Sequence, residues 1–202
     1  MKVPPCYIHG MGMINALGAN ATEVASGLAG ASPLAGHALT LHDGRRVCVG
    51  AVTDALPALP AALMRHSTRN NRLLLAALRQ IEGEIAAAIA RFGAERVAVV
   101  MGTSTSGIAE AELAFHATPA GGHDEHFVYP QMELGAPASF LAEHLELDGP
   151  AYTVSTACTS GAKALASARN LIRSGLVDVV IAGGVDSLCR LTLRGFTALE
   201  ST

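Results

Sequence analysis

Short apolar runs alternate along this chain with longer stretches in which apolar residues recur at helical spacing. Four short runs predict β-strands, at residues 6–9, 97–101, 151–155 and 177–182. The last three are almost continuously apolar, which is typical of strands covered on both faces. Glycine or small polar residues follow each of them, as expected where a strand ends.

Helical patterns lie between these strands. The longest is 69–92, which Gly93 can terminate, and its apolar residues recur at steps of three and four: Leu74, Leu78, Ile81, Ile85 and Ile89. Further helices are expected over 20–30, with Asn20 or Thr22 as the cap, over 136–147 and over 161–174. Strands that alternate with helices predict an α/β fold with a mostly parallel sheet.

Two segments have no such periodicity and are expected to be loops. They are 32–60, which contains the hairpin-like stretch 42–52, and 118–131. No internal repeat or low-complexity tail divides the chain. We therefore expect residues 1–202 to form a single domain.

Composition narrows the functional classes. The 202 residues carry a net charge of −3, which gives no electrostatic case for a nucleic-acid partner. Four scattered cysteines fit neither a zinc ribbon nor a disulfide scaffold, so we expect reduced thiols and a cytoplasmic location. The N-terminus does not read as a signal peptide, and no apolar run of about 18 residues predicts a membrane span.

The stretch "VSTACTSGAKALASARNLIRSG" places Cys158 at the turn from a predicted strand into a predicted helix. The free N–H groups and the positive dipole end of a helix stabilise a thiolate, and they also stabilise an oxyanion on an attacked carbonyl. A lone cysteine is more often a small core residue, and Cys6, Cys48 and Cys189 are interpreted in that way. The elbow position favours a nucleophile at Cys158.

The helix that follows Cys158 is apolar around much of its circumference. Its small and apolar residues are Ala162, Ala164, Leu165, Ala166, Ala168 and Leu171. A helix that is apolar on most sides is usually buried. The sequence therefore predicts a central buried helix that starts near Cys158.

The segment "VSTACTSGAKALASARNLIRSGLVDVVIAGGVDSLCRLTLRGFTAL" closely resembles the active-site region of β-ketoacyl-acyl-carrier-protein synthases. Three other pieces agree in order: "YIHGMGMINALGANATEVASGLAGASP", "VAVVMGTSTSGIAEAE" and "LAEHLELDGPAYTVSTAC". The resemblance covers essentially the whole chain. The T-A-C-[ST]-S-G motif with the downstream A-G-G is highly specific.

This resemblance implies the N-terminal half of a thiolase-like α/β fold, with a mixed but mostly parallel sheet and helices on both faces. The resemblance further implies that the second half, which holds the two catalytic histidines of the family, lies outside this chain. Cys158 is then the acyl acceptor in a decarboxylative Claisen condensation, and Thr103 and Ile108 are candidates for lining the acyl pocket. No metal or cofactor is implied.

The resemblance also implies partners. They are an acyl carrier protein, acyl and malonyl thioesters, and a second ketosynthase-like subunit in a homodimer or heterodimer. Related chain-length-factor subunits commonly have glutamine at the position of Cys158, so the cysteine favours a condensing subunit.

Arginines are spaced along the region before and within the longest predicted helix. They are Arg65, Arg69, Arg72 and Arg79, and no acidic residue falls between Asp54 and Glu82. Such a basic face attracts an acidic partner, and in the resembled family a basic patch near this position docks the carrier protein. We expect Arg65, Arg69 and Arg72 to act in this docking; the alternative is an ordinary solvated helix face.

Two other functions are compatible with these residues. The chain could be a truncated, non-enzymatic subunit that binds carrier protein or a partner synthase. It could also be an unrelated cysteine hydrolase in which one of eight histidines is the base. His123 and His126 have a weak metal-like spacing, but a solvated loop is the favoured interpretation of that segment.

Overall fold

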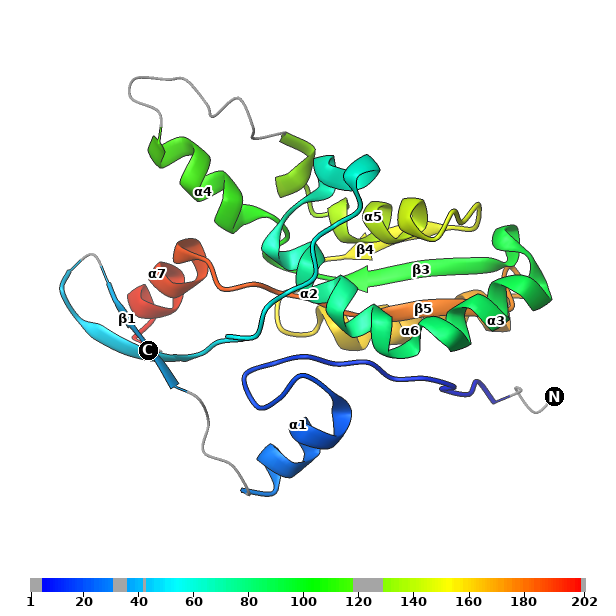
Figure 1. Ribbon diagram of the computed structural model, residues 1–202, viewed down its shortest axis with the longest axis horizontal. Coiled ribbons are helices and arrows are strands. Elements are labelled where there is room, and N and C mark those ends of the chain that lie inside the picture. The colour runs from blue at the N-terminus through cyan, green and yellow to red at the C-terminus, as the bar shows by residue number, and fades with distance from the viewer. Residues whose placement is uncertain (1–4, 31–35, 42, 118–128, 201–202) are drawn as a thin grey trace.

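The computed structural model describes residues 5–30, 36–41, 43–117 and 129–200 (Figure 1). Its strands are β1 Gly36–Thr40, β2 Arg46–Gly50, β3 Val97–Gly102, β4 Ala151–Val154 and β5 Val179–Gly184. Its helices are α1 Ala21–Leu28, α2 Arg69–Leu78, α3 Glu82–Phe92, α4 Ile108–Ala117, α5 Ala136–His144, α6 Ser160–Arg173 and α7 Arg190–Ala198. Short 3₁₀ turns occur at η1 Ala61–His66, η2 Arg79–Ile81, η3 Ala94–Arg96 and η5 Tyr129–Met132.

The central sheet has three parallel strands in the order β4-β3-β5. Val99 of β3 pairs with Ala151 of β4, and Val97 pairs with Val179 of β5. All six residues of β3 are buried, as its apolar run predicts, whereas β4 and β5 are half-buried edge strands in this chain. The parallel sheet and its three strands are therefore confirmed.

Helices cover both faces of this sheet. On one face, α6 packs on β3 and β5, with Ala164 and Ala168 buried against the strands. On the other face, α2, α3 and α5 form the main core, in which Leu75, Phe140 and Met101 are almost completely buried. The carboxyl ends of the strands point toward the part of the molecule that holds α4, α7 and the β1-β2 hairpin (Figure 1).

The prediction of a buried helix after Cys158 is only half correct in this chain. The face of α6 that meets the sheet is buried, but Leu165 is 51% exposed, and Ala162 and Ala166 are exposed as well. The reason is that α6 contacts chiefly β3, β4 and β5, so a single layer covers it. The apolar residues on the outer face of α6 are not covered by any of the described residues.

The predicted strand at 6–9 is wrong, because residues 5–14 form no strand. This segment lies against α2, η2 and α3 instead of joining the sheet. Gly12 approaches α2 so closely that a Cβ there would lie 2.0 Å from the Ala77 carbonyl oxygen. The Gln80 side chain accepts from the Met13 N–H and donates to the Met13 carbonyl, so this side chain takes the place of a strand neighbour.

The predicted helix over 69–92 is two helices, α2 and α3, separated by the 3₁₀ turn η2. Gln80 lies in that turn, and its side chain also donates to the carbonyls of Ala19 and Ala76. The helical periodicity is therefore right, but a tertiary contact breaks the helix. Gly93, with a φ of 88°, ends α3 as expected.

The other predicted elements are confirmed, with shifts of a few residues at their ends. Asn20 is the cap of α1, since its side chain accepts from the Glu23 N–H at 3.0 Å. The stretch 42–52 contributes to an antiparallel β1-β2 hairpin. Helices α4 and α7 were not predicted, and residues 118–128 of the second predicted loop lie outside the described residues.

Candidate active site

Cys158 lies in the turn between β4 and α6, at the carboxyl end of the central sheet, and it is exposed. The turn is formed by residues 155–159, and α6 begins at Ser160. In parallel α/β sheets, ligand sites lie beyond the carboxyl ends of the strands. The position predicted from the sequence is therefore the position in the structure.

The turn is a strained elbow. Ala157, the residue before the cysteine, has a φ of 53°, which is unfavourable for any residue other than glycine. The Thr156 N–H donates to Ser160 Oγ at 2.9 Å, and Ser160 Oγ donates to the Ala157 carbonyl at 2.6 Å. Thr159 Oγ1 donates to the Thr156 carbonyl at 2.8 Å. These short-range bonds hold Ala157 in its conformation and present Cys158 outward.

Glycines let the start of α6 approach the strands. A Cβ on Gly102, the last residue of β3, would lie 2.5 Å from the Ser160 carbonyl carbon. A Cβ on Gly184, the last residue of β5, would lie 3.2 Å from the Gly161 Cα. Only residues without side chains allow this contact, so the sequence of the strand ends fixes the position of the helix terminus.

The N-terminal end of α6 has no side-chain cap. The Ser160 N–H donates to the Ala157 carbonyl at 3.0 Å, and no side chain accepts from the amides that begin the helix. The positive end of a helix favours an oxyanion that develops on a carbonyl attacked beside it.

The two residues predicted to line an acyl pocket differ in their placement. Thr103 is fully buried, and its Oγ1 donates to Asp186 Oδ1 at 3.0 Å, so its hydroxyl is engaged inside the protein. Ile108 is half-buried at the first residue of α4. Both lie on the loop and helix that follow β3, next to the elbow strand in the sheet.

The predicted basic face is divided in the structure. The Arg69 guanidinium donates to the Val52 carbonyl, and Arg72 donates to the Leu56 carbonyl at 2.9 Å, so both fasten the segment that follows β2. Both of these arginines are half-buried. Arg65 is exposed and forms an ion pair with Glu143 of α5, while Arg79 is exposed on η2.

Glu143 joins η1 to α5. Its carboxylate lies 2.8 Å from His66 Nε2 and also pairs with Arg65. The hydrogen bond from His66, followed by the charge of Arg65, lowers the pKa of Glu143. The His66 ring lies near Phe140, with ring centroids 5.9 Å apart, so the carboxylate holds this ring over the core.

We predict an acid-dependent loss of stability from this ion pair. A carboxyl whose pKa is lowered by folding stabilises the folded state above its unfolded pKa of about 4.3 and loses this effect as the pH falls through the folded value. Glu143→Gln should therefore lower the urea midpoint at neutral pH. The difference from the parent chain should begin to shrink below about pH 4.3 and vanish only below the lowered pKa of Glu143 in the folded state. A difference that stays constant into strong acid would contradict this prediction.

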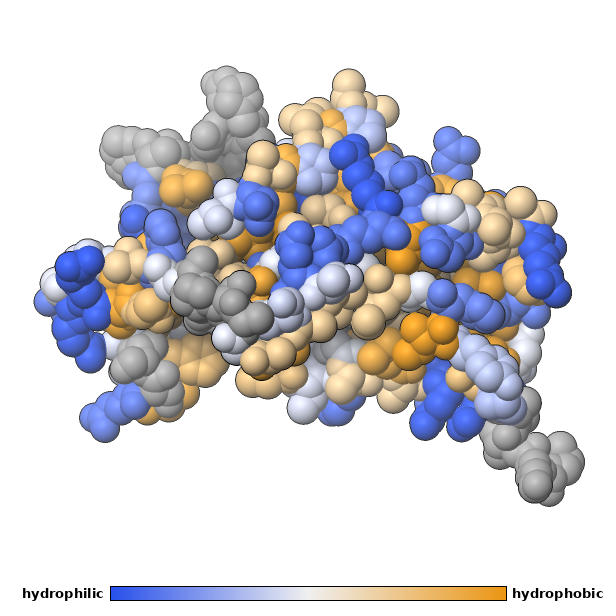
Figure 2. Space-filling model, turned by 60° about the horizontal axis from the view of Figure 1, so that its bottom comes forward, coloured by the Kyte–Doolittle hydropathy of each residue, from blue (hydrophilic) through white to orange (hydrophobic). Residues whose placement is uncertain are grey.

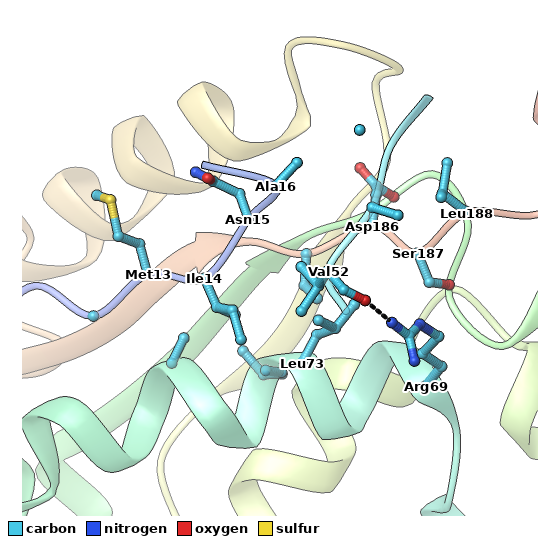
Figure 3. Close-up of a pocket in the computed structure, with 17 residues that line it drawn as sticks. Met13, Ile14, Asn15, Ala16, Val52, Arg69, Leu73, Asp186, Ser187 and Leu188 are labelled. Atoms are coloured by element: carbon cyan, nitrogen blue, oxygen red, sulfur yellow. Dashed lines mark hydrogen bonds between the residues drawn. The ribbon is translucent and has the colours of Figure 1, made fainter. Parts of the chain in front are cut away.

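A cavity of about 400 Å³ lies beside the sheet (Figure 3). Its walls come from residues 12–16, from the segment after β2, from α2 and from the segment after β5. Arg69, Asp186 and Ser187 supply polar groups, and Ile14 and Leu73 supply apolar ones. Cys158 is not among the lining residues, so this cavity is separate from the elbow. Asp186 was not predicted as a site residue, because the sequence marks it only by its position shortly after "AGG".

The described histidines offer no base for the cysteine and no metal site. No hydrogen bond joins Cys158 to a histidine in the described ranges, and His66 and His144 both pack near Phe140. The same part of the chain holds no group of three or more potential metal ligands. His123 and His126 lie outside the described residues. No helix within them has the length and apolar character needed to cross a membrane.

Comparison with protein families decides the affiliation. Residues 7–202 match the model of the β-ketoacyl synthase, N-terminal domain. The chain belongs to the β-ketoacyl synthase family. The α/β fold is thus the thiolase-like fold that the sequence motifs implied, and the matched range includes Cys158.

Individual relatives agree with this assignment. The chain is 38% identical over 76 residues to 3-oxoacyl-[acyl-carrier-protein] synthase 2 of Rhizobium meliloti (strain 1021), covering 37% of this chain and 18% of the relative. It is 28% identical over 200 residues to nodulation protein E of Rhizobium meliloti, covering 96% of this chain and 50% of that protein.

Among solved structures, a chain of the complex of a ketosynthase (ApeO) with its chain length factor (ApeC) from Xenorhabdus doucetiae is similar at a TM-score of 0.87 and 45% identity. The match covers 96% of this chain and 50% of the solved one. The chain therefore spans about half the length of the solved chain it resembles, and its match to the Rhizobium synthase covers 18% of that protein.

Proposed function

We propose that this chain carries the acyl-accepting half of a condensing enzyme of fatty-acid or polyketide synthesis. The Cys158 thiolate attacks an acyl thioester, the carrier thiol leaves, and an acyl-enzyme forms. A malonyl thioester then loses CO₂, and its carbanion attacks the acyl-enzyme to form the new carbon–carbon bond and release the thiolate. Neither step draws on a metal or an organic cofactor.

One observation carries the proposal. Cys158 is exposed on a strained elbow at the uncapped N-terminus of α6, while its neighbours Ala157, Thr159 and Ser160 hold the turn in place. Strain of this kind persists where the surrounding structure maintains it, and it concentrates at functional sites. Family membership supports the same role, since the elbow falls within the matched domain.

The test is covalent labelling. The chain is incubated with cerulenin or with an acyl thioester, and mass spectrometry locates the modified residue. We expect modification of Cys158 and not of Cys48, which is also exposed but lies within strand β2 and not at an elbow that leads into a helix. Modification of another cysteine alone, or none at neutral pH, would remove the case for an activated thiolate.

We further propose that residues 1–202 are one half of the active fold and that a second half or a ketosynthase-like subunit covers α6. Leu165 of α6 is exposed, as are Leu176 beyond its end and Phe196 of α7. Figure 2 shows hydrophobic residues at the surface of one face between hydrophilic ones. Exposed apolar patches mark interaction surfaces. The chain length factor in the ApeO structure supports a subunit of this kind. Light scattering that finds a stable monomer without aggregation would count against the proposal.

An acyl carrier protein is the proposed partner for substrate delivery, as the name of the Rhizobium synthase suggests for that protein. Of the three proposed docking residues, Arg69 and Arg72 also fasten the segment after β2, so their replacement would change stability together with binding. Arg65 is the suitable probe, because its side chain is 59% exposed.

We predict that Arg65→Ala weakens binding of an acidic carrier protein by about two- to fivefold at low salt, since surface charges mainly steer association. The difference should disappear at high ionic strength. The control is Arg91→Ala, which removes an exposed arginine of α3 that lies over Phe92. Equal binding by both variants and the parent chain, measured by titration calorimetry, would remove Arg65 from the docking site.

A non-enzymatic subunit is the second candidate, because the similar solved structure contains a chain length factor beside a ketosynthase. Carrier-protein binding without acylation of Cys158 would favour it. The hydrolase alternative has less support, since no described histidine is hydrogen-bonded to Cys158. A cytoplasmic location stays a prediction from the four sparse cysteines, which are all free thiols.

A further inference from the structure

A carboxylate from one strand end fixes the loop that follows another. Asp186, just after β5, accepts four hydrogen bonds on a single oxygen, Oδ1. The donors are Thr103 Oγ1 at 3.0 Å, Ser104 N at 2.7 Å, Thr105 N at 3.0 Å and Thr105 Oγ1 at 3.0 Å. Asp186 therefore ties the loop after β3 to the end of β5.

The loop that it holds is buried and strained. Thr103 and Thr105 are 0% and 3% exposed, and Ser106 has a φ of 42°. The Ser106 N–H donates to Thr103 Oγ1 at 3.0 Å, which is the same hydroxyl that donates to Asp186. Strained residues thus lie at the carboxyl ends of two neighbouring strands, Ser106 after β3 and Ala157 after β4.

The loop and the elbow are linked through the strand ends and the helix start that carry them. The Thr103 N–H donates to the carbonyl of Val154, the last residue of β4, at 3.3 Å. Gly102 packs on the first turn of α6, where a Cβ would lie 2.5 Å from the Ser160 carbonyl carbon. Closely packed atoms transmit a displacement to their neighbours. A movement of the loop is therefore expected to move the residues that present Cys158.

We propose that Asp186 is a positioning residue of this site. It fixes the loop of residues 103–106 and, through that loop, the elbow of Cys158 and the wall beside an acyl group on the thiol. The link to acyl transfer rests on the proposed function, whereas the link between loop and elbow does not. Because all four bonds reach one oxygen, asparagine can keep them, whereas alanine removes them all.

The experiment compares Asp186→Ala, Asp186→Asn and Asp186→Glu in the protein in its natural assembly. The control is Asp148→Ala, an exposed aspartate outside this network at the opposite end of the sheet, just before β4. The first measurement is hydrogen exchange of peptides that cover 103–107 and 154–160. The second is the ratio of two rates at Cys158, acylation by a medium-chain acyl thioester and alkylation by iodoacetamide.

We expect Asp186→Ala to speed exchange in both peptides by about tenfold. It should also lower the acylation-to-alkylation ratio by about tenfold or more, because small displacements affect a bound substrate more than a small reagent. Asp186→Glu, with its carboxylate displaced by one methylene, should act in the same direction and serves if the alanine variant does not fold. Asp186→Asn and Asp148→Ala should stay within about twofold of the parent.

Faster exchange confined to 103–107 would overturn the proposal, because the elbow would then be independent of the loop. If the parent chain is acylated and Asp186→Ala leaves the acylation-to-alkylation ratio unchanged, the positioning role is overturned. Failure of Asp186→Asn to restore the ratio would do the same. If the parent is not acylated at Cys158, the proposed function fails, and the exchange data alone decide whether Asp186 positions the elbow.

Discussion

Replacement of Cys158 by serine is expected to slow acyl transfer to this chain by about a thousandfold or more. A cysteine thiol is intrinsically more nucleophilic than a serine hydroxyl and depends less on a partner base. A serine hydroxyl would need a general base, and no described histidine is hydrogen-bonded at position 158. Single-turnover acylation, followed by intact-protein mass spectrometry, measures the effect.

The matched control is Cys48→Ser, which changes the exposed cysteine of β2 and should leave the rate unchanged. The fold should survive in both variants, since Cys158 is exposed and fills no part of the core. Circular dichroism and thermal unfolding check this. A serine variant acylated within about tenfold of the parent rate would show that the thiol is not the acceptor.

The substitution Gly102→Ala is expected to destabilise the protein by about 1–3 kcal/mol, which is the usual cost of overpacking a core. The new Cβ would lie 2.5 Å from the Ser160 carbonyl carbon and 2.6 Å from the Gly161 nitrogen, and both are backbone atoms that cannot move aside as a side chain would. The helix terminus must therefore shift away from β3. This shift also moves the elbow, so acylation of Cys158 should fall by about tenfold or more.

Gly83→Ala is the control for this glycine substitution. Gly83 lies in α3, and nothing is within 4 Å of an added Cβ. Because alanine is the better helix former, this variant should gain up to about 1 kcal/mol and keep the full acylation rate. Chemical denaturation of both variants gives the two free energies of unfolding. If Gly102→Ala is as stable and as reactive as Gly83→Ala, the close contact between strand and helix has no energetic importance.

Several features could be read from local sequence because they depend on neighbours along the chain. Apolar runs gave β3, β4 and β5, and three- and four-residue spacing gave most of α2 and α3. Asn20 caps the start of α1 by a hydrogen bond to the Glu23 N–H, and Gly93 ends α3 through its positive φ, so both depend only on nearby residues. The elbow belongs to this class as well, since Ala157, Thr159 and Ser160 fix it with short-range hydrogen bonds.

Other features could not be read in this way because long-range contacts decide them. The segment 6–9 has the apolar pattern of a strand. The residues that follow it pack against helix α2 instead, through the bond of Gln80 to Met13 and the close approach of Gly12. Arg69 and Arg72 look like half of a docking face, yet carbonyl groups more than ten residues away in sequence take up their guanidinium groups. Asp186 carried no recognisable motif, and its four bonds exist only because β5 and β3 are neighbours.

By itself, the sequence determined the α/β class, the parallel strands, the family and the placement of Cys158 before a helix, since local periodicity and a specific motif encode these features. Only the tertiary structure decided which faces are covered. It showed that α6 is buried on the sheet side and open on the other, although its apolar residues encircle the helix. Burial depends on which elements pack together in space, and a one-dimensional pattern does not contain that information.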